Sequence, residues 1–176
     1  TRETLDRLEL MIALSGADGG VVGMALLAGD APRAQAMAQR LAQCFAGRFY
    51  IELQRAGLAS NETHVRRAVA LAAQLRLPVV ATHPVQFLEA EDYEAHEARV
   101  CIADGHILAD PRRPKRFTPD QYFKSRADMR AAFADLPEAT ANTIEIARRC
   151  AFRPLPAEPS LPRFAAERDE PEELRV

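Results

Sequence analysis

Residues 77–88 read Leu77-Pro78-Val79-Val80-Ala81-Thr82-His83-Pro84-Val85-Gln86-Phe87-Leu88 and decide the fold class. The short apolar run 79–82, which follows a proline, predicts a buried strand with polar residues after it. An α/β barrel that binds metal ions carries its ligands at such a strand end. Here the strand end offers His83, Pro84 and Gln86. This is a poor set of ligands, because proline has no donor side chain and an amide binds metals more weakly than imidazole or carboxylate.

Two more strands and two helices precede this stretch in alternation. The apolar run 8–14 and the alternating run 49–54 predict strands. Apolar residues at helical spacing predict helices over 33–45 and 61–75, the second with Asn61 as its N-cap. Connections this long favour parallel pairing, and three parallel strands need helices on both faces or further strands that close a barrel. The sequence therefore predicts an α/β fold with parallel βαβαβ order.

A helical region follows Leu88. Residues 91–103 have helical spacing, residues 109–117 form a basic loop broken by prolines, and four prolines in 154–162 predict an extended linker. Helix start signals occur at Thr118, Ser125 and Asp135. We therefore expect a helical extension after the parallel unit.

The composition is that of a globular chain with no general preference for nucleic acid or membrane. Apolar residues make up 48% of the chain and the formal net charge is -2, so no overall attraction to phosphates is expected. The sequence has no apolar run of about 18 residues that would span a bilayer. Cys44, Cys101 and Cys150 are widely spaced, as is typical of reduced thiols in the cytoplasm. Because the chain starts at Thr1 rather than Met and ends in charged residues, we expect a piece of a longer protein.

The one basic cluster of the sequence lies in the proline-broken loop. It consists of Arg112, Arg113, Lys115 and Arg116. Such a cluster can bind nucleic acid by neutralising phosphates, but short basic loops of this kind are usually only solvated. Solvation is the favoured interpretation, with DNA binding as the alternative.

Two other patterns resemble functional motifs but lack a necessary part. His96-Glu97 has no second histidine one turn later, which a zinc-binding helix needs, so we expect the pair at the helix surface or in a hydrogen bond between helices. The glycines at positions 16, 19, 20 and 23 lack the spacing of a phosphate-binding loop. They predict a tight turn after the first strand.

Several short blocks, in order and at compatible spacing, are similar to one protein family. The blocks are Ala13–Gly16, Phe49–Gly57, Leu77–Phe87, Glu94–Val100, Asp110–Lys115, Gln121–Ser125 and Ala141–Cys150. On these blocks the chain resembles the alpha subunits of bacterial replicative DNA polymerase III (C family), in the later part of their N-terminal PHP (polymerase and histidinol phosphatase) domain. The resemblance implies a partial (β/α)7 PHP-type barrel in residues 1–90. It also implies a helical segment that joins the barrel to the polymerase body in 91–153, and a linker with the start of the next region in 154–176.

The resemblance also implies a metal site, and this chain departs from it. In members with metals, a Ser-Gly turn continues with Cys and a late strand ends in Asn-Asp-x-His, and the metals support phosphoester cleavage. Here Ala17 follows the Ser-Gly turn, and His83, Pro84 and Gln86 stand in the late motif. We therefore expect no catalytic residue, metal or cofactor in this segment, with His83 as a weak metal candidate.

For the parent protein, the resemblance implies DNA synthesis in the cytoplasm, with Mg ions in an active site downstream of Val176. A PHP domain without metals would be a scaffold that packs on the polymerase body and holds the separate proofreading exonuclease subunit. One alternative is an active metal-dependent phosphoesterase or 3′-5′ exonuclease that uses His83 and ligands upstream of Thr1. Another is a module that contacts DNA through residues 112–116.

Overall fold

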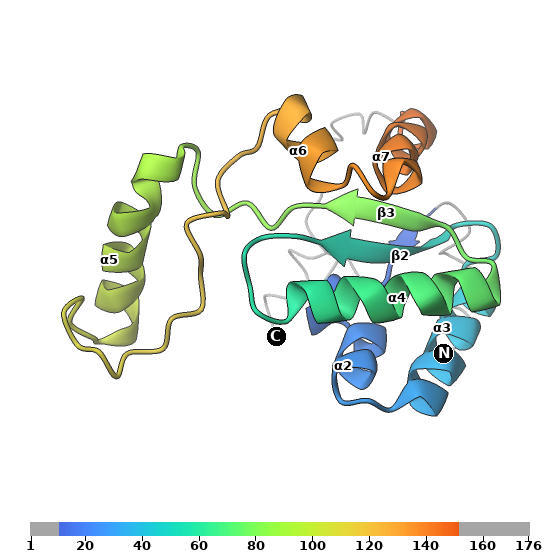
Figure 1. The fold of residues 1–176 in the computed structure, drawn as a ribbon, viewed down its shortest axis with the longest axis horizontal. Helices are drawn as coiled ribbons and strands as arrows, with labels where there is room; N and C mark the ends of the chain where they lie inside the picture. The colour runs from blue at the N-terminus through green and yellow to red at the C-terminus, as the bar shows by residue number, and fades with distance from the viewer. Residues whose placement is uncertain (1–10, 152–176) are drawn as a thin grey trace, which may run out of the picture.

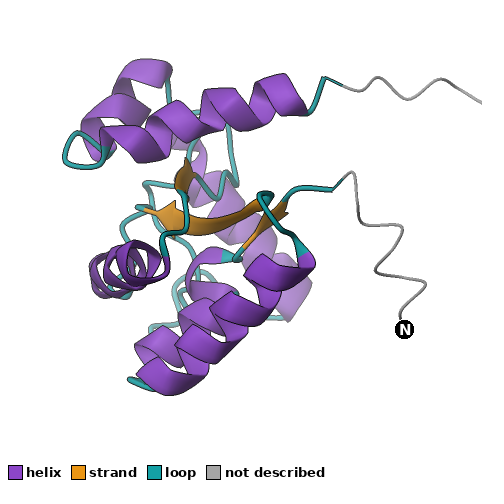
Figure 2. Ribbon diagram, turned by 90° about the vertical axis from the view of Figure 1, so that its right-hand side faces the viewer, coloured by secondary structure: helices purple, strands orange, loops and turns teal. Residues whose placement is uncertain are grey.

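A three-stranded parallel sheet forms the centre of the protein (Figure 1). The computed structural model describes residues 11–151. Its elements are β1 (Ala13–Leu14), η1 (Ala17–Gly19), α2 (Val21–Leu27), α3 (Ala31–Cys44), β2 (Phe49–Gln54), α4 (Asn61–Leu75), β3 (Val79–Thr82), η2 (Ala90–Asp92), α5 (Tyr93–Asp104), α6 (Arg126–Ala132) and α7 (Pro137–Arg149). Seen from the side, helices lie on both sides of the strands (Figure 2).

The strand order is β1-β2-β3, with Ile51 of β2 opposite Val79 of β3. This confirms the predicted parallel βαβαβ order, and β2 and β3 occupy their predicted residues. The first strand is shorter than the predicted run 8–14. Of the residues of this run that the structure describes, only Ala13–Leu14 form the strand β1. Residues 8–10 lie outside the described part of the chain.

Two helices connect β1 to β2, where the spacing predicts one. The α3 helix begins two residues before the predicted range and ends one residue earlier. The α2 helix corrects the prediction of a tight turn at these glycines. The turn is expected because a short segment that contains Gly23 and follows other glycines has a low intrinsic propensity for helix. Asn61 is the first residue of α4 and not its N-cap. Its side-chain oxygen instead accepts hydrogen bonds from the backbone of Ala56 (2.8 Å) and Leu58 (3.2 Å), which fixes the preceding loop.

The main core joins the sheet to the surrounding helices. The α4 helix packs on β2, α7 packs on β3, and α2 packs on both α3 and α4. Ile51 and Leu53 are fully buried in this core, together with Ala34, Ala38 and Ala68 of the helices. Small alanine side chains allow helix and sheet to approach closely, which suits the dense packing of protein interiors.

Both faces of β2 are buried, although its alternation predicts one apolar and one polar face. Tyr50 and Glu52 point away from Ile51 and Leu53, and both are buried. The Tyr50 hydroxyl accepts a hydrogen bond from Arg149 at the end of α7 (2.9 Å). Buried polar groups need hydrogen-bond partners, so the polar face of β2 is where a functional or structural network is expected.

Residues 85–123, which we call the α5 arm, carry α5 away from the sheet (Figure 1). Two backbone hydrogen bonds close the neck of this arm. The Gln86 amide donates to the Gln121 carbonyl (2.8 Å), and the Phe123 amide donates to the Leu88 carbonyl (3.2 Å). The arm therefore leaves the body at the carboxyl end of β3 and returns beside its own start.

The structure corrects one of the three predicted helix starts. Thr118 lies in a turn, where its hydroxyl donates to the Ala56 carbonyl and its amide donates to the Gln121 side chain. Capping-box residues are thus used here to hold a loop. The starts near Ser125 and Asp135 are confirmed by α6 and α7, and the predicted linker 154–162 lies outside the described residues.

The α5 arm has a small core of its own. His96 is buried, with its ring 4.7 Å from Phe117 and 5.5 Å from Phe87, measured between ring centres. Glu97 is also buried and forms an ion pair with Arg113. Of the two expected positions, the helix surface is wrong, because the arm folds back over this face of α5, and the partner of Glu97 is Arg113 in a loop rather than a residue of a second helix.

Candidate functional site

The carboxyl ends of the three strands are joined by a buried polar cluster, which we call the rim network. Its members are Ser15, Glu52, Gln54 and Thr82. Glu52 accepts hydrogen bonds from the Gly16 amide (3.0 Å), the Thr82 hydroxyl (2.5 Å) and the Gln54 side chain (3.3 Å). The Glu52 amide donates to the Ser15 hydroxyl (2.9 Å). One carboxylate thus connects β2 to the ends of both neighbouring strands.

Replacing Glu52 by glutamine is expected to lower the free energy of unfolding by about 1–3 kcal/mol. The carboxylate of Glu52 only accepts hydrogen bonds, whereas the NH2 group of glutamine would face the donors that now bind the carboxylate. Chemical denaturation of the 176-residue chain measures the change. Glu91→Gln, at an exposed position, is the matched control. Equal stability of the two variants would show that the rim network contributes nothing to folding.

A second polar cluster lies beside the rim network at the start of α4. Asp18 accepts hydrogen bonds from the Ser60 hydroxyl (2.9 Å) and the Asn61 amide (3.5 Å). His64, on the first turn of α4, is 1% exposed. Burial lowers the pKa of His64 below its ordinary value, and the nearby Asp18 and Glu52 carboxylates offset this only in part. His64 is therefore held in its neutral form.

This lowered pKa predicts an acid-sensitive fold. Because unfolded His64 takes up a proton near its ordinary pKa of 6.5 and folded His64 only at lower pH, stability falls as the pH drops below about 6.5. The loss levels off below the folded pKa. Melting temperatures from pH 8 to pH 5 measure the dependence, and His64→Phe is expected to reduce it, with the remainder due to His83, whose pKa is also lowered. His106→Gln, at an exposed position, should leave it unchanged.

The positions predicted to have lost metal ligands lie near this rim without forming a metal site. Ala17 is buried and Pro84 has no donor side chain, although its carbonyl accepts a hydrogen bond from Gln121 (3.2 Å). Gln86 is exposed at the neck of the α5 arm. Within residues 11–151, no three His, Cys, Asp or Glu side chains lie close enough together to hold a metal ion. Ala17 and Pro84 offer no side-chain donor to a metal ion, and the expected absence of a metal in this segment stays a prediction.

His83 is partly buried at the end of β3. Neither ring nitrogen has a hydrogen-bond partner at normal distance and angle within the described chain, although the backbone of Asp120 and Tyr122 lies close enough to favour the protonated ring. Burial lowers the pKa of His83, and the nearby Lys124 lowers it further, while Asp120 acts in the opposite direction. A neutral imidazole is a competent metal ligand, but within the described residues His83 belongs to no group of three His, Cys, Asp or Glu side chains that could hold a metal ion.

The basic loop of the α5 arm is largely neutralised by its own acidic neighbours. Arg113 pairs with the buried Glu97, and its Nε also donates to the Leu108 carbonyl (3.1 Å). Arg116 pairs with Asp104, and Arg112 pairs with Asp110 (3.3 Å). Lys115 is exposed. Binding of DNA by these four residues stays a prediction, and Arg113 has a structural role that the sequence pattern does not indicate.

Arg55 connects the end of β2 to the C-terminal helices. Its guanidinium donates to both oxygens of Asp135 (2.6 and 2.9 Å), to Glu62 (2.9 Å) and to the Ala132 carbonyl (2.6 Å). It also lies 5.1 Å from the centre of the Phe133 ring. Hydrogen bonding to Arg55 lowers the pKa of Asp135 below its usual value. This single side chain therefore holds the loop between α6 and α7 against the sheet.

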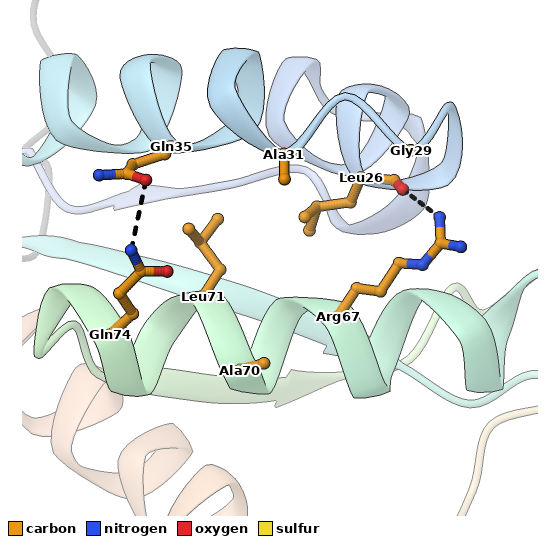
Figure 3. A pocket seen from close by; sticks show the side chains of 8 residues that line it. All are labelled: Leu26, Gly29, Ala31, Gln35, Arg67, Ala70, Leu71 and Gln74. Atoms are coloured by element: carbon orange, nitrogen blue, oxygen red, sulfur yellow. Dashed lines mark hydrogen bonds between the residues drawn. The ribbon is translucent and has the colours of Figure 1, made fainter.

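A groove lies away from the rim, between α4 and the α2–α3 connection (Figure 3). Its volume is about 400 Å³. Arg67 donates to the Leu26 carbonyl at one end, and Gln74 donates to Gln35 (3.3 Å) at the other. Leu71 lines the middle of the groove. Arg67, the charged residue of the lining, is thus already hydrogen bonded, and the groove contains no candidate nucleophile or base.

Within the described residues, no helix has the length and apolar character needed to cross a membrane.

Comparisons with known proteins find similarity to one kind of protein. The chain is 49% identical over 142 residues to DNA polymerase III subunit alpha of Pseudomonas aeruginosa, which is 81% of this chain and 12% of that protein. It is 46% identical over 160 residues to the same subunit of Vibrio cholerae and 43% identical over 156 residues to that of Escherichia coli K12. It spans only 14% and 13% of those two proteins. No family model matches the chain. Over these residues the chain is similar to one segment of the DNA polymerase III alpha subunits.

Proposed function

We propose that this chain is a catalytically silent scaffold segment of a replicative DNA polymerase. In this proposal it forms part of a PHP-type (β/α)7 barrel of a cytoplasmic, DNA-binding polymerase III alpha subunit. It packs on the polymerase body and holds the proofreading exonuclease subunit. Magnesium-dependent nucleotide transfer takes place elsewhere in the parent chain. The names of the relatives support the activity of the parent protein. The side chains at the strand ends support the absence of catalysis in this segment.

The observation that carries the scaffold proposal is the use of the rim side chains. Glu52, Gln54 and Thr82 hydrogen bond to one another and to the turn after β1, so the polar groups at the strand ends stabilise the sheet. Ala17 and Pro84 cannot coordinate a cation. A phosphoesterase needs metal ligands at this edge of the sheet, and His83 alone does not supply them.

The barrel proposal is supported by the edges of the sheet. Within the described chain β1 pairs only with β2, and the exposed side chains of Met11, Leu14, Val21 and Met24 lie on β1 and nearby segments. A parallel sheet is normally covered on both faces, and an exposed apolar edge favours pairing with a further strand. We propose that parallel strands of the parent chain pair with β1.

The opposite edge of the sheet is covered by α7. The Asn142 side chain donates a hydrogen bond to the Val79 carbonyl of β3 (2.8 Å), so this backbone acceptor is satisfied by a helix. Further strands of the proposed barrel are therefore expected at β1.

The full-length parent protein tests the proposed function. With a primed template, Mg²⁺ and deoxynucleotides, it is expected to extend the primer, and it is expected to co-elute with the purified exonuclease subunit in size-exclusion chromatography. Primer degradation by the parent protein alone, dependent on added Mn²⁺ or Zn²⁺ and lost on His83→Ala, would contradict the silent scaffold. Failure to extend the primer would contradict the parent activity.

A further inference from the structure

The α5 arm exposes large apolar side chains at its neck. Leu88 is 69% exposed and Phe123 is 68% exposed, and the two residues are neighbours across the backbone hydrogen bond that closes the neck. Val85 is also exposed. We call Leu88 and Phe123 the neck patch. A cluster of exposed apolar residues on a soluble domain marks a surface that another protein segment covers.

The arm has little support from the rest of the described structure. Among the described elements, α5 packs closely only on η2, its own N-terminal turn, and it stands apart from the sheet in Figure 1. Two further large residues, Ile102 and Ile107, are 83% and 75% exposed at the far end of the arm. A projecting element with a small core and exposed apolar residues at both ends gains stability from an additional contact.

The charges of the arm favour a protein occupant over nucleic acid. Arg112, Arg113 and Arg116 each pair with an acidic residue of the arm, so few positive charges are available to phosphates. Lys124, next to Phe123, pairs with Asp120 (2.7 Å). The surface around the neck patch is thus apolar with compensated charges, which is typical of a protein interface.

We propose that the neck patch docks against a folded part of the parent polymerase chain outside residues 1–176. The length of the relatives supports this occupant, because the chain spans only 12–14% of them and most of the parent polypeptide lies outside the segment. The proposal rests on the proposed function, since it takes the parent to be a polymerase III alpha subunit. It assigns the contact to Leu88 and Phe123, which the comparisons do not do.

Hydroxyl-radical footprinting of the full-length parent protein tests this contact without any substitution. Oxidation of Leu88 and Phe123 is measured by peptide mass spectrometry in the native and the urea-unfolded protein. If the two side chains are buried in an interface, their oxidation in the native protein is expected to be about tenfold slower than in the unfolded protein. Native rates within about twofold of the unfolded rates, as expected for side chains that remain in solvent, would overturn the proposal.

The same preparation distinguishes the other occupants and the parent function. Protection that disappears when the protein is diluted to a monomer would assign the patch to a second copy, and protection that needs added DNA or exonuclease would assign it to those partners. Either result overturns the proposal. Primer extension by the same sample tests the proposed function separately. If the sample extends the primer and Phe123 is oxidised as fast as in the unfolded protein, the docking proposal is contradicted and the proposed function is not.

A pair of variants in the full-length protein gives a second test. Leu88→Ser combined with Phe123→Ser is expected to lower the melting temperature of the full-length protein. Ile144→Ser, at a half-exposed position of α7, is the control and should have the smaller effect. Equal melting temperatures for the double variant and the wild type would contradict the docking.

Discussion

Leu53→Ala is expected to lower the free energy of unfolding by about 2–5 kcal/mol, because it removes a fully buried side chain from the middle strand of the sheet. Leu53 belongs to the main core, which contains residues of β2, β3, α2, α3 and α4. The surrounding elements are fixed by the sheet and cannot fully close the resulting cavity. Urea unfolding of the 176-residue chain, followed by circular dichroism, measures the loss.

Ile144→Ala is a suitable control for this change, since Ile144 is 52% exposed on α7. It is expected to change stability by less than about 1 kcal/mol. A loss at Leu53 no larger than the loss at Ile144 would show that the middle strand is not the centre of the core.

Gly23→Ala is expected to destabilise the chain by about 1–3 kcal/mol or more, because the added methyl group has no room. A Cβ atom at Gly23 would lie 1.9 Å from the Ala17 carbonyl oxygen, which belongs to the backbone and cannot rotate away. The α2 helix would have to move from the turn that follows β1. Since the Gly16 amide in this turn donates to Glu52, the rim network would be disturbed as well.

Gly19 provides a matched control four residues earlier. A Cβ atom at Gly19 meets no atom within 4 Å, and Gly19 is not among the glycines with positive φ. Gly19→Ala is therefore expected to fold as stably as the wild type. Thermal unfolding of both variants compares them, and equal melting temperatures would contradict the close approach of α2 to the turn.

The parallel core was predictable because its pattern is local. The apolar runs at β2 and β3 and the helical spacing of α3 and α4 each depend on neighbouring residues, and the structure has these elements at nearly the predicted positions. The α2 helix and the turn at Thr118 were not predictable in this way. Both depend on distant contacts: α2 on the packing of Gly23 against Ala17, and the turn on the bond from Thr118 to Ala56.

The sequence indicated which strand ends to inspect, and the loss of metal ligands at these strand ends stays a prediction. Ala17, His83 and Pro84 lie near the strand ends where the fold class predicts them. Glu52 and His64 were missed. The signal for Glu52 was present, since a carboxylate in a strand must find partners if both faces of the strand are buried. Whether both faces are buried depends on elements far along the chain, and sequence spacing does not show this.

Metal analysis of the full-length parent protein tests the central claim most directly. After dialysis against buffer without metals, elemental analysis is combined with hydrolysis of a chromogenic phosphoester. If the rim is held together by Glu52 and Thr82 and lacks ligands at Ala17 and Pro84, the protein retains no stoichiometric zinc or manganese and does not hydrolyse the ester. Tightly bound zinc or manganese that supports hydrolysis, both lost on His83→Ala, would contradict the account.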